Sequence, residues 1–334
     1  MYLSSLNTFF FSMLLLGTLL AFSSLSWFSV WTGLELNLLS FIPLIMSSNS
    51  RYSSEAALKY FLIQALGSSL IIFSSSILLF SPKLFSFIIT PALLLKLGVS
   101  PFHFWFTQIM ESLLWPQAII LMTIQKMAPI FLLSYLISPF NIIWMLMISS
   151  ILSAIVGALG GINQTSLRSI MAFSSINHMA WVIMASIISE YMLFLYFSFY
   201  CLISSSIVLM FFSNQNFHFF HIFNQNSLHP HMKIITLVSL LSLGGFPPFT
   251  GFFPKWILIQ EMINASLFFT LLILLSSSLI TLYFYLRISF SFLILSSSKL
   301  KPSLKQSNFF HFFSPIFASL NLFGILIPCC IMMF

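Results

Sequence analysis

Four ionisable side chains lie inside stretches of sequence that are otherwise apolar: Glu35, Lys96, Lys126 and Lys255. If these stretches cross a membrane, each ionised group near the bilayer centre costs roughly 2.5–3.5 kcal/mol even on the most lenient insertion scale. An apolar residue would avoid that cost, so ionisable residues at such depths are functional candidates by default. We therefore take these four as candidates for the chemistry of the protein.

The chemistry that suits them is proton transfer. Burial disfavours the charged form of a lysine, and a nearby carboxylate restores it, so lysine can bind and release a proton as its partner moves. Arginine cannot, and Arg51, Arg168 and Arg287 lie only at the ends of the apolar stretches. The alternative is a set of structural ion pairs, or lysines whose ammonium groups reach the membrane surface, above all for Lys255.

Three further residues are candidates for a relay. His103 and His178 lie within or at the ends of apolar stretches, where a neutral imidazole can pass protons or can simply be a hydrogen-bonded packing residue. Lys59 follows Glu55 by four residues, in the order that favours an ion pair on a helix. A structural pair at the start of a helix explains Lys59 at least as well as a role in coupling.

The composition explains why these groups must be in a membrane. Of the 334 residues, 59% are apolar and only 5% are charged, whereas a soluble domain carries roughly 25% charged residues. Lipid must therefore be the main solvent. The formal net charge of +7 does not indicate nucleic acid, because no basic cluster is interleaved with aromatic residues on a polar surface.

The elements that position the candidates are transmembrane helices. A helix needs about 20 apolar residues to cross the hydrocarbon layer, and runs of this length are too long for barrel strands. The sequence predicts an all-α bundle of about eleven such helices, forming a single antiporter-like domain over residues 1–334. The predicted spans are 3–23, 27–46, 54–80, 84–108, 112–137, 141–161, 167–188, 191–213, 233–263, 265–292 and 310–334.

Two of these spans carry helix-breaking residues in their middle. Residues 96–103 (KLGVSPFH) and 243–251 (LGGFPPFTG) combine glycine with proline. At membrane depth an interrupted helix survives only where protein or a water-filled cavity surrounds it, and a pair of such spans indicates an ion or substrate pathway. A proline kink is the alternative for either one alone. Two interruptions, each beside a buried lysine, favour a functional role.

Loop charge predicts the topology. Counting crossings from the N-terminus places most loop cations on one side and only Lys83 on the other, so the N-terminus is predicted on the inner side. The cations on the inner side are Arg51, Lys59, Arg168, Lys233, Arg287, Lys299, Lys301 and Lys305.

The sequence offers no redox or metal site. Cys201, Cys329 and Cys330 form no C-x-x-C pair and no four-thiolate set for zinc or an iron–sulfur cluster. A histidine-rich loop has no acidic residue or cysteine nearby, which favours a solvated loop over a metal site; its histidines are His218, His221, His229 and His231. The chain also lacks a glycine-rich nucleotide motif, so we expect no direct NADH binding.

Seven stretches carry a family likeness. The chain closely resembles subunit 2 of mitochondrial NADH:ubiquinone oxidoreductase (respiratory complex I), of the short animal type, as in arthropods. The matching stretches run in family order from about residue 14 to residue 290. They are WTGLELN (31–37), EAALKYFL (55–62), LKLGVSPFHFW (95–105), QKMAP (125–129), GGINQTSLR (160–168), SSINHM (174–179), and GGFPP (244–248) with GFFPKW (251–256).

This resemblance implies an antiporter-like subunit of the membrane arm that translocates protons while quinone is reduced in other subunits. By motif match, Glu35 and Lys96 would form a gating ion pair, Lys126 would be the central lysine, and Lys255 the lysine of the second broken helix. The implied partners are the other membrane-arm subunits and the lipid of the mitochondrial inner membrane, with the N-terminus in the matrix. NADH, FMN, iron–sulfur clusters and ubiquinone would bind elsewhere in the complex. A stand-alone cation/proton antiporter and a purely structural subunit are the alternatives.

Overall fold

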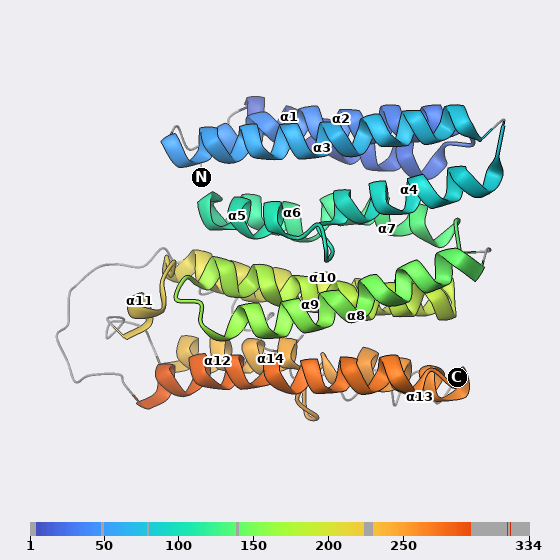
Figure 1. Ribbon diagram of the computed structural model, residues 1–334. Coiled ribbons are helices and arrows are strands. Elements are labelled where there is room, and N and C mark those ends of the chain that lie inside the picture. The colour runs from blue at the N-terminus through green and yellow to red at the C-terminus, as the bar shows by residue number, and fades with distance from the viewer. Residues whose placement is uncertain are drawn as a thin grey trace. The chain divides into compact units, whose positions relative to one another are not determined.

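The computed structural model describes residues 5–47, 50–78, 80–137, 140–223 and 230–294, together with Ser319 and Asn321 (Figure 1). This part of the chain is helical and contains no strand; Ser166 and His218 form an isolated β-bridge. The chain divides into two compact units, Met1–Ser153 and Ala154–Phe334, and the boundary falls inside one continuous helix. Whether the whole chain acts as a single domain stays a prediction.

The described part of the first unit contains seven complete helices. Within it α1, α2 and α3 run side by side, and α4 to α7 follow as shorter helices (Figure 1). Their bounds are α1 Ser5–Ser23, α2 Trp27–Met46, α3 Arg51–Ile77, α4 Pro82–Leu97, α5 Phe104–Ser112, α6 Trp115–Met122 and α7 Ile124–Ser134.

The second unit contains six helices in its described part and shares α8 with the first. Helix α9 is almost entirely buried and contacts both α10 and α14, while α12 contacts α10 and α14. The bounds are α8 Phe140–Ile162, α9 Leu167–Ile188, α10 Glu190–Asn214, α11 Phe219–Phe223, α12 Pro230–Gly244, α13 Phe252–Asn264 and α14 Phe268–Ile294.

Glycine lets α1 and α2 pack backbone to backbone. A Cβ on Gly33 would lie 2.7 Å from the backbone nitrogen of Ala21 and 2.8 Å from the carbonyl oxygen of Gly17. Between helices in lipid there is no hydrophobic driving force, so association depends on such close contacts of small residues. Gly17 and Ala21 lie four residues apart on α1 and form the small-residue face that α2 needs.

Eight segments of the described chain are long and apolar enough to cross a membrane, by length and composition. Of the eleven predicted spans, three are outside this set. Two of them, 84–108 and 233–263, are each divided into two helices, α4 with α5 and α12 with α13. The third, 310–334, lies outside the described residues apart from Ser319 and Asn321. The figure of eleven therefore stays a prediction, while the helical membrane-protein fold is confirmed.

A third irregularity was not predicted. The predicted span 112–137 is interrupted at Thr123, where φ −111° and ψ −76° separate α6 from α7. The Thr123 hydroxyl donates to the Ile119 carbonyl at 2.7 Å, and the Lys126 amide donates to the Thr123 carbonyl at 3.2 Å. Lys126 thus lies in the first turn of a new helix rather than in the middle of a regular one.

Candidate functional site

Lys96 lies in the last turn of α4, directly before the first interruption. The helix ends because Gly98 adopts a left-handed conformation, with φ +68°, and residues 98–103 make turns before α5 begins. A cation in the last turn of a helix is favoured by the partial negative charge of the unpaired carbonyls there. The side chain is nevertheless buried, with only 6% exposed.

The carbonyl groups released by this interruption have partners from neighbouring segments. The Trp105 indole nitrogen donates to the Leu95 carbonyl at 3.0 Å, and the Gln64 amide donates to the Lys96 carbonyl at 3.3 Å. Unpaired backbone groups away from water are costly, so these two side chains allow the helix to stop inside the unit. Gln64 was not among the predicted site residues, and Trp105 was predicted only as part of a motif. Its polar position one helical turn after Tyr60 on α3 was the available signal for Gln64.

Lys96 and Lys126 line the same cavity. The cavity is small, and its walls also include Tyr60, Gln64, Leu97, Trp105, Phe106, Leu121 and Gln125. The Lys126 ammonium lies 4.3 Å from the centre of the Phe106 ring, a cation–π distance, and the residue is 2% exposed. The Tyr60 hydroxyl donates to the Gln125 side-chain oxygen at 3.0 Å. Two lysines thirty positions apart therefore share one polar cavity.

Glu35 acts on this cavity from a distance. Its charge influences both Lys96 and Tyr60 electrostatically, and its Oε2 atom is buried without a hydrogen-bond partner in the described part of the chain. No salt bridge joins Glu35 to Lys96 among the described residues. The arrangement is a carboxylate within electrostatic reach of a buried lysine, which a modest movement of either side chain would strengthen or weaken.

Lys255 lies in the second unit, next to the second interruption. It is in the first turn of α13, 6% exposed, and its ammonium donates to the carbonyl of Gly244, the last residue of α12, at 2.9 Å. Gly245 has φ +80°, and a Cβ there would lie 2.9 Å from the Lys255 ammonium nitrogen. A side chain at residue 245 would be strained at this φ and would crowd the Lys255 ammonium, which reaches the end of α12.

His178 and Lys255 are connected through the aromatic side chains of Trp181 and Tyr196. Trp181 stands three residues after His178 on α9, and its ring is 6.0 Å from the Lys255 ammonium. The Tyr196 ring stacks on Trp181, with centres 6.3 Å apart, and the Tyr196 hydroxyl is 3.1 Å from the His178 Nδ1 atom. Both predicted candidates of the second unit therefore belong to one neighbourhood.

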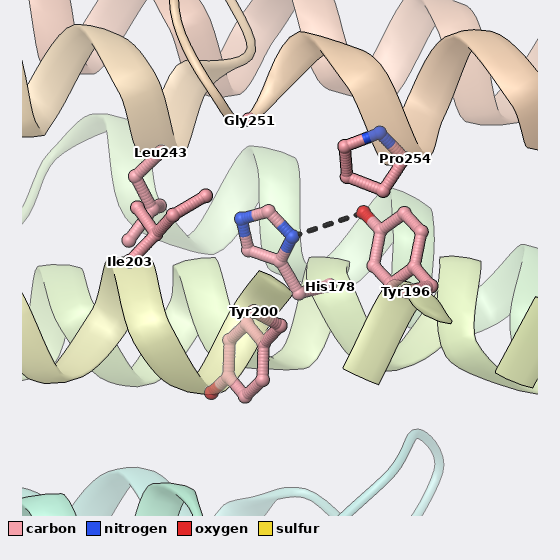
Figure 2. A pocket seen from close by; sticks show the side chains of 7 residues that line it. All are labelled: His178, Tyr196, Tyr200, Ile203, Leu243, Gly251 and Pro254. Atoms are coloured by element: carbon pink, nitrogen blue, oxygen red, sulfur yellow. Dashed lines mark hydrogen bonds between the residues drawn. The ribbon is translucent and has the colours of Figure 1, made fainter. Parts of the chain in front are cut away.

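His178 faces a cavity beside the second interruption, as Figure 2 shows. The cavity is small and lies between α9, α10 and the segment joining α12 to α13. Its lining residues are His178, Tyr196, Tyr200, Ile203, Leu243, Gly251 and Pro254. A half-buried imidazole beside a phenol can relay protons or can serve as a packing residue.

The other two relay candidates, His103 and Lys59, do not line the cavity that contains Lys96 and Lys126. His103 caps the start of α5 and is 8% exposed, with its ring 4.1 Å from that of Phe104. Lys59 forms a 2.6 Å salt bridge with Glu55, and the two side chains are 42% and 61% exposed. Such an exposed pair contributes little to stability, so its geometry fits the helix-start interpretation.

The described residues contain no group of three histidine, cysteine or acidic side chains that could hold a metal ion. His218 and His221 are exposed, with ring centres 5.5 Å apart. His229 lies outside the described residues, as do Cys329 and Cys330, and the side chain of His231 is not described.

Comparisons with known proteins agree with this architecture. The family model described as NADH:quinone oxidoreductase/Mrp antiporter, TM, matches residues 24–83 and 80–281. NADH-ubiquinone oxidoreductase chain 2 of Anopheles gambiae is 47% identical over 312 residues, covering 90% of each chain.

Two solved structures share the fold. Respiratory complex I from Thermus thermophilus contains a chain with TM-score 0.79 and 22% identity, over 94% of this chain and 76% of that one. A chain of the Mrp complex from Dietzia sp. gives TM-score 0.76 and 17% identity, over 87% of this chain and 61% of that one. The interrupted helices and the buried lysines agree with the sequence identity to the insect protein, which extends over 90% of the chain. This chain therefore belongs to the NADH-ubiquinone oxidoreductase chain 2 family.

Proposed function

We propose that the chain is a membrane-arm subunit of a proton-translocating NADH:ubiquinone oxidoreductase and that its buried lysines carry the protons. The observation that carries the proposal is the cavity shared by Lys96 and Lys126 beside an interrupted helix. A lysine is the cation that can change protonation state when its surroundings change, and both members of the pair are almost fully buried.

In the first step, charge rearrangement driven by quinone reduction in other subunits alters the field of Glu35 at Lys96. When the carboxylate's influence weakens, the buried ammonium of Lys96 loses stabilisation and gives up its proton. The proton passes within the cavity towards Lys126, where Tyr60 and Gln125 supply polar groups on the wall.

In the second step the proton moves on to Lys255. The Gly244 carbonyl holds the ammonium of that lysine at the end of α12, where the helix dipole favours positive charge. His178 and Tyr196 would serve as a relay beside it, and His103 would serve beside the first interruption. Lys59 keeps a structural role in this scheme, paired to Glu55.

The proposed setting is the mitochondrial inner membrane, with about eleven spans, two broken helices and the N-terminus in the matrix. One observation supports the predicted sidedness within the second unit. The Arg287 guanidinium donates to the Ile162 carbonyl at 3.2 Å, at the end of α8, while Arg168 lies in the first turn of α9. Both arginines therefore lie at the same end of this unit, as loop-charge counting requires.

The partners in this proposal are the other membrane-arm subunits and the surrounding lipid. NADH, FMN, the iron–sulfur clusters and ubiquinone would be bound by other subunits, and the role of this chain would be confined to protons. The second candidate function is a stand-alone cation/proton antiporter, favoured by the fold shared with the Mrp complex chain. Cation-dependent proton flux by the isolated chain in liposomes would favour that alternative, and co-migration with other subunits on a native gel would favour the complex.

The experiment that tests the proposed function replaces Lys126 with methionine in the assembled complex. The substitution keeps the length and apolar stem of the side chain and removes its protonatable group. We expect a lower proton-to-electron ratio than in the unsubstituted complex. Lys83→Met is the matched control because Lys83 is exposed at the start of α4. Unchanged pumping in Lys126→Met would remove Lys126 from the path.

A further inference from the structure

Asn321 is a buried polar residue in the apolar C-terminal stretch, where no motif was recognised. It is 2% exposed. An amide can donate two hydrogen bonds and accept two more, and leaving it unpaired in a buried place is costly. Its hydrogen-bond partners therefore indicate the role of Asn321.

Those contacts lie on both sides of the second interruption. The Ser242 hydroxyl, in the last turn of α12, shares its proton between the Ser239 carbonyl at 2.7 Å and the Asn321 side-chain oxygen at 3.2 Å. The Thr250 backbone amide, at the far end of the connecting segment, donates to the backbone carbonyl of Asn321 at 3.3 Å, a bond that does not depend on the asparagine side chain. One residue thus joins the end of one half-helix to the segment that starts the other.

The same residue is also tied to a long helix. The Asn321 amide nitrogen donates to the Ser206 hydroxyl of α10 at 3.3 Å. Helix α10 also supplies Tyr196 and Tyr200, which line the cavity facing His178. The interruption is consequently held against the element that carries the aromatic partners of His178.

Close backbone contacts also hold the segment that connects α12 to α13. A Cβ on Gly251 would collide with the carbonyl oxygen of Ser242, and the Gly245 amide donates to that same oxygen at 3.0 Å. Lys255 reaches the Gly244 carbonyl only while these two ends of the segment stay in place. A displacement of about 1 Å at a reacting group can lower the reaction rate by about a hundredfold.

We infer that Asn321 is a positioning residue for proton transfer, which holds the α12–α13 interruption in the geometry that places the Lys255 ammonium on the Gly244 carbonyl. This inference rests on the proposed function of Lys255. It assigns Asn321 a part in the mechanism.

The test replaces Asn321 with leucine in the assembled complex and measures the proton-to-electron ratio together with NADH oxidation and the amount of complex on a native gel. We expect a loss in the ratio at an unchanged amount of complex. Asn177→Leu is the matched control, since Asn177 is also a buried asparagine with two side-chain hydrogen bonds, to Ser277 and Thr281, away from the interruption.

Two further variants keep the inference falsifiable. If Asn321→Leu fails to assemble, Ser242→Ala removes the hydrogen bond to Asn321 with a minimal change of volume and should also lower the ratio. Lys255→Met separates the inference from the proposed function. A normal ratio in Lys255→Met overturns the role of Lys255. A lowered ratio in Lys255→Met beside normal ratios in Asn321→Leu and Ser242→Ala overturns the role of Asn321 alone. An equal loss in Asn177→Leu would also overturn it.

Discussion

The ammonium of Lys255 and the carbonyl of Gly244 are 2.9 Å apart, although a seven-residue interruption separates the helices that carry them. This contact puts the cation at the end of α12, where unpaired carbonyls give partial negative charge. Lys96 has the related position, in the last turn of α4 before its own interruption. In both units a buried lysine is thus associated with the end of a half-helix.

Replacing Gly245 with alanine should disturb the hydrogen bond between the Lys255 ammonium and the Gly244 carbonyl. At φ +80° a residue with a Cβ costs roughly 1–2 kcal/mol, and the added carbon would lie 2.9 Å from the Lys255 ammonium nitrogen. We expect a lower proton-to-electron ratio in the complex that assembles. Gly244→Ala is the control, because its Cβ would meet nothing nearer than 3.4 Å. Equal ratios in the two variants would contradict the importance of this geometry.

Replacing Glu35 with glutamine should weaken proton transfer without preventing assembly. The substitution keeps the shape of the side chain and removes the charge that acts on Lys96 and Tyr60. Glu55→Gln removes an equally charged group from an exposed ion pair, which is worth about 0–1 kcal/mol at most. We expect slower coupled turnover in Glu35→Gln than in Glu55→Gln, measured as NADH oxidation with proton uptake. The same rate in both variants would count against a role for Glu35.

Replacing Gly33 with valine should prevent α1 and α2 from packing. The nearest atoms to its Cβ position belong to the backbone of α1, which cannot move aside as a flexible side chain can. Overpacking of this kind costs about 1–3 kcal/mol. We expect less assembled complex on a native gel. Leu36→Val, at a position 40% exposed on the same helix, should leave the amount of complex nearly unchanged. Normal assembly of Gly33→Val would show that the helices can separate.

The helical character of the described chain could be predicted from the sequence, for physical reasons. In lipid an apolar run of about 20 residues has no alternative to helix, and glycine with proline marks where a helix stops. Gly98 and Gly245 are the residues that adopt positive φ at the two predicted places. The buried lysines could be identified as candidates because only 5% of the residues in this chain are charged.

Other features could not be predicted because they depend on tertiary contacts or on weak local signals. The interruption at Thr123 contains neither glycine nor proline, so a search for these residues misses it. The sharing of one cavity by Lys96 and Lys126 requires α4 and α7 to pack together, which spacing alone does not specify. Motif likeness implied a Glu35–Lys96 ion pair, whereas the described structure has an electrostatic influence without a salt bridge. The contacts of Asn321 join parts of the chain more than seventy residues apart.

The central claim is that these lysines act by exchanging protons and not merely by carrying charge. Lys126→Arg separates the two, because arginine keeps a positive charge but does not release its proton. The measurement is the proton-to-electron ratio of the assembled complex, with Lys83→Arg as the exposed control. The account predicts a lowered ratio in Lys126→Arg and a normal ratio in Lys83→Arg. A normal ratio in Lys126→Arg would contradict it and would leave Lys126 with a structural charge only.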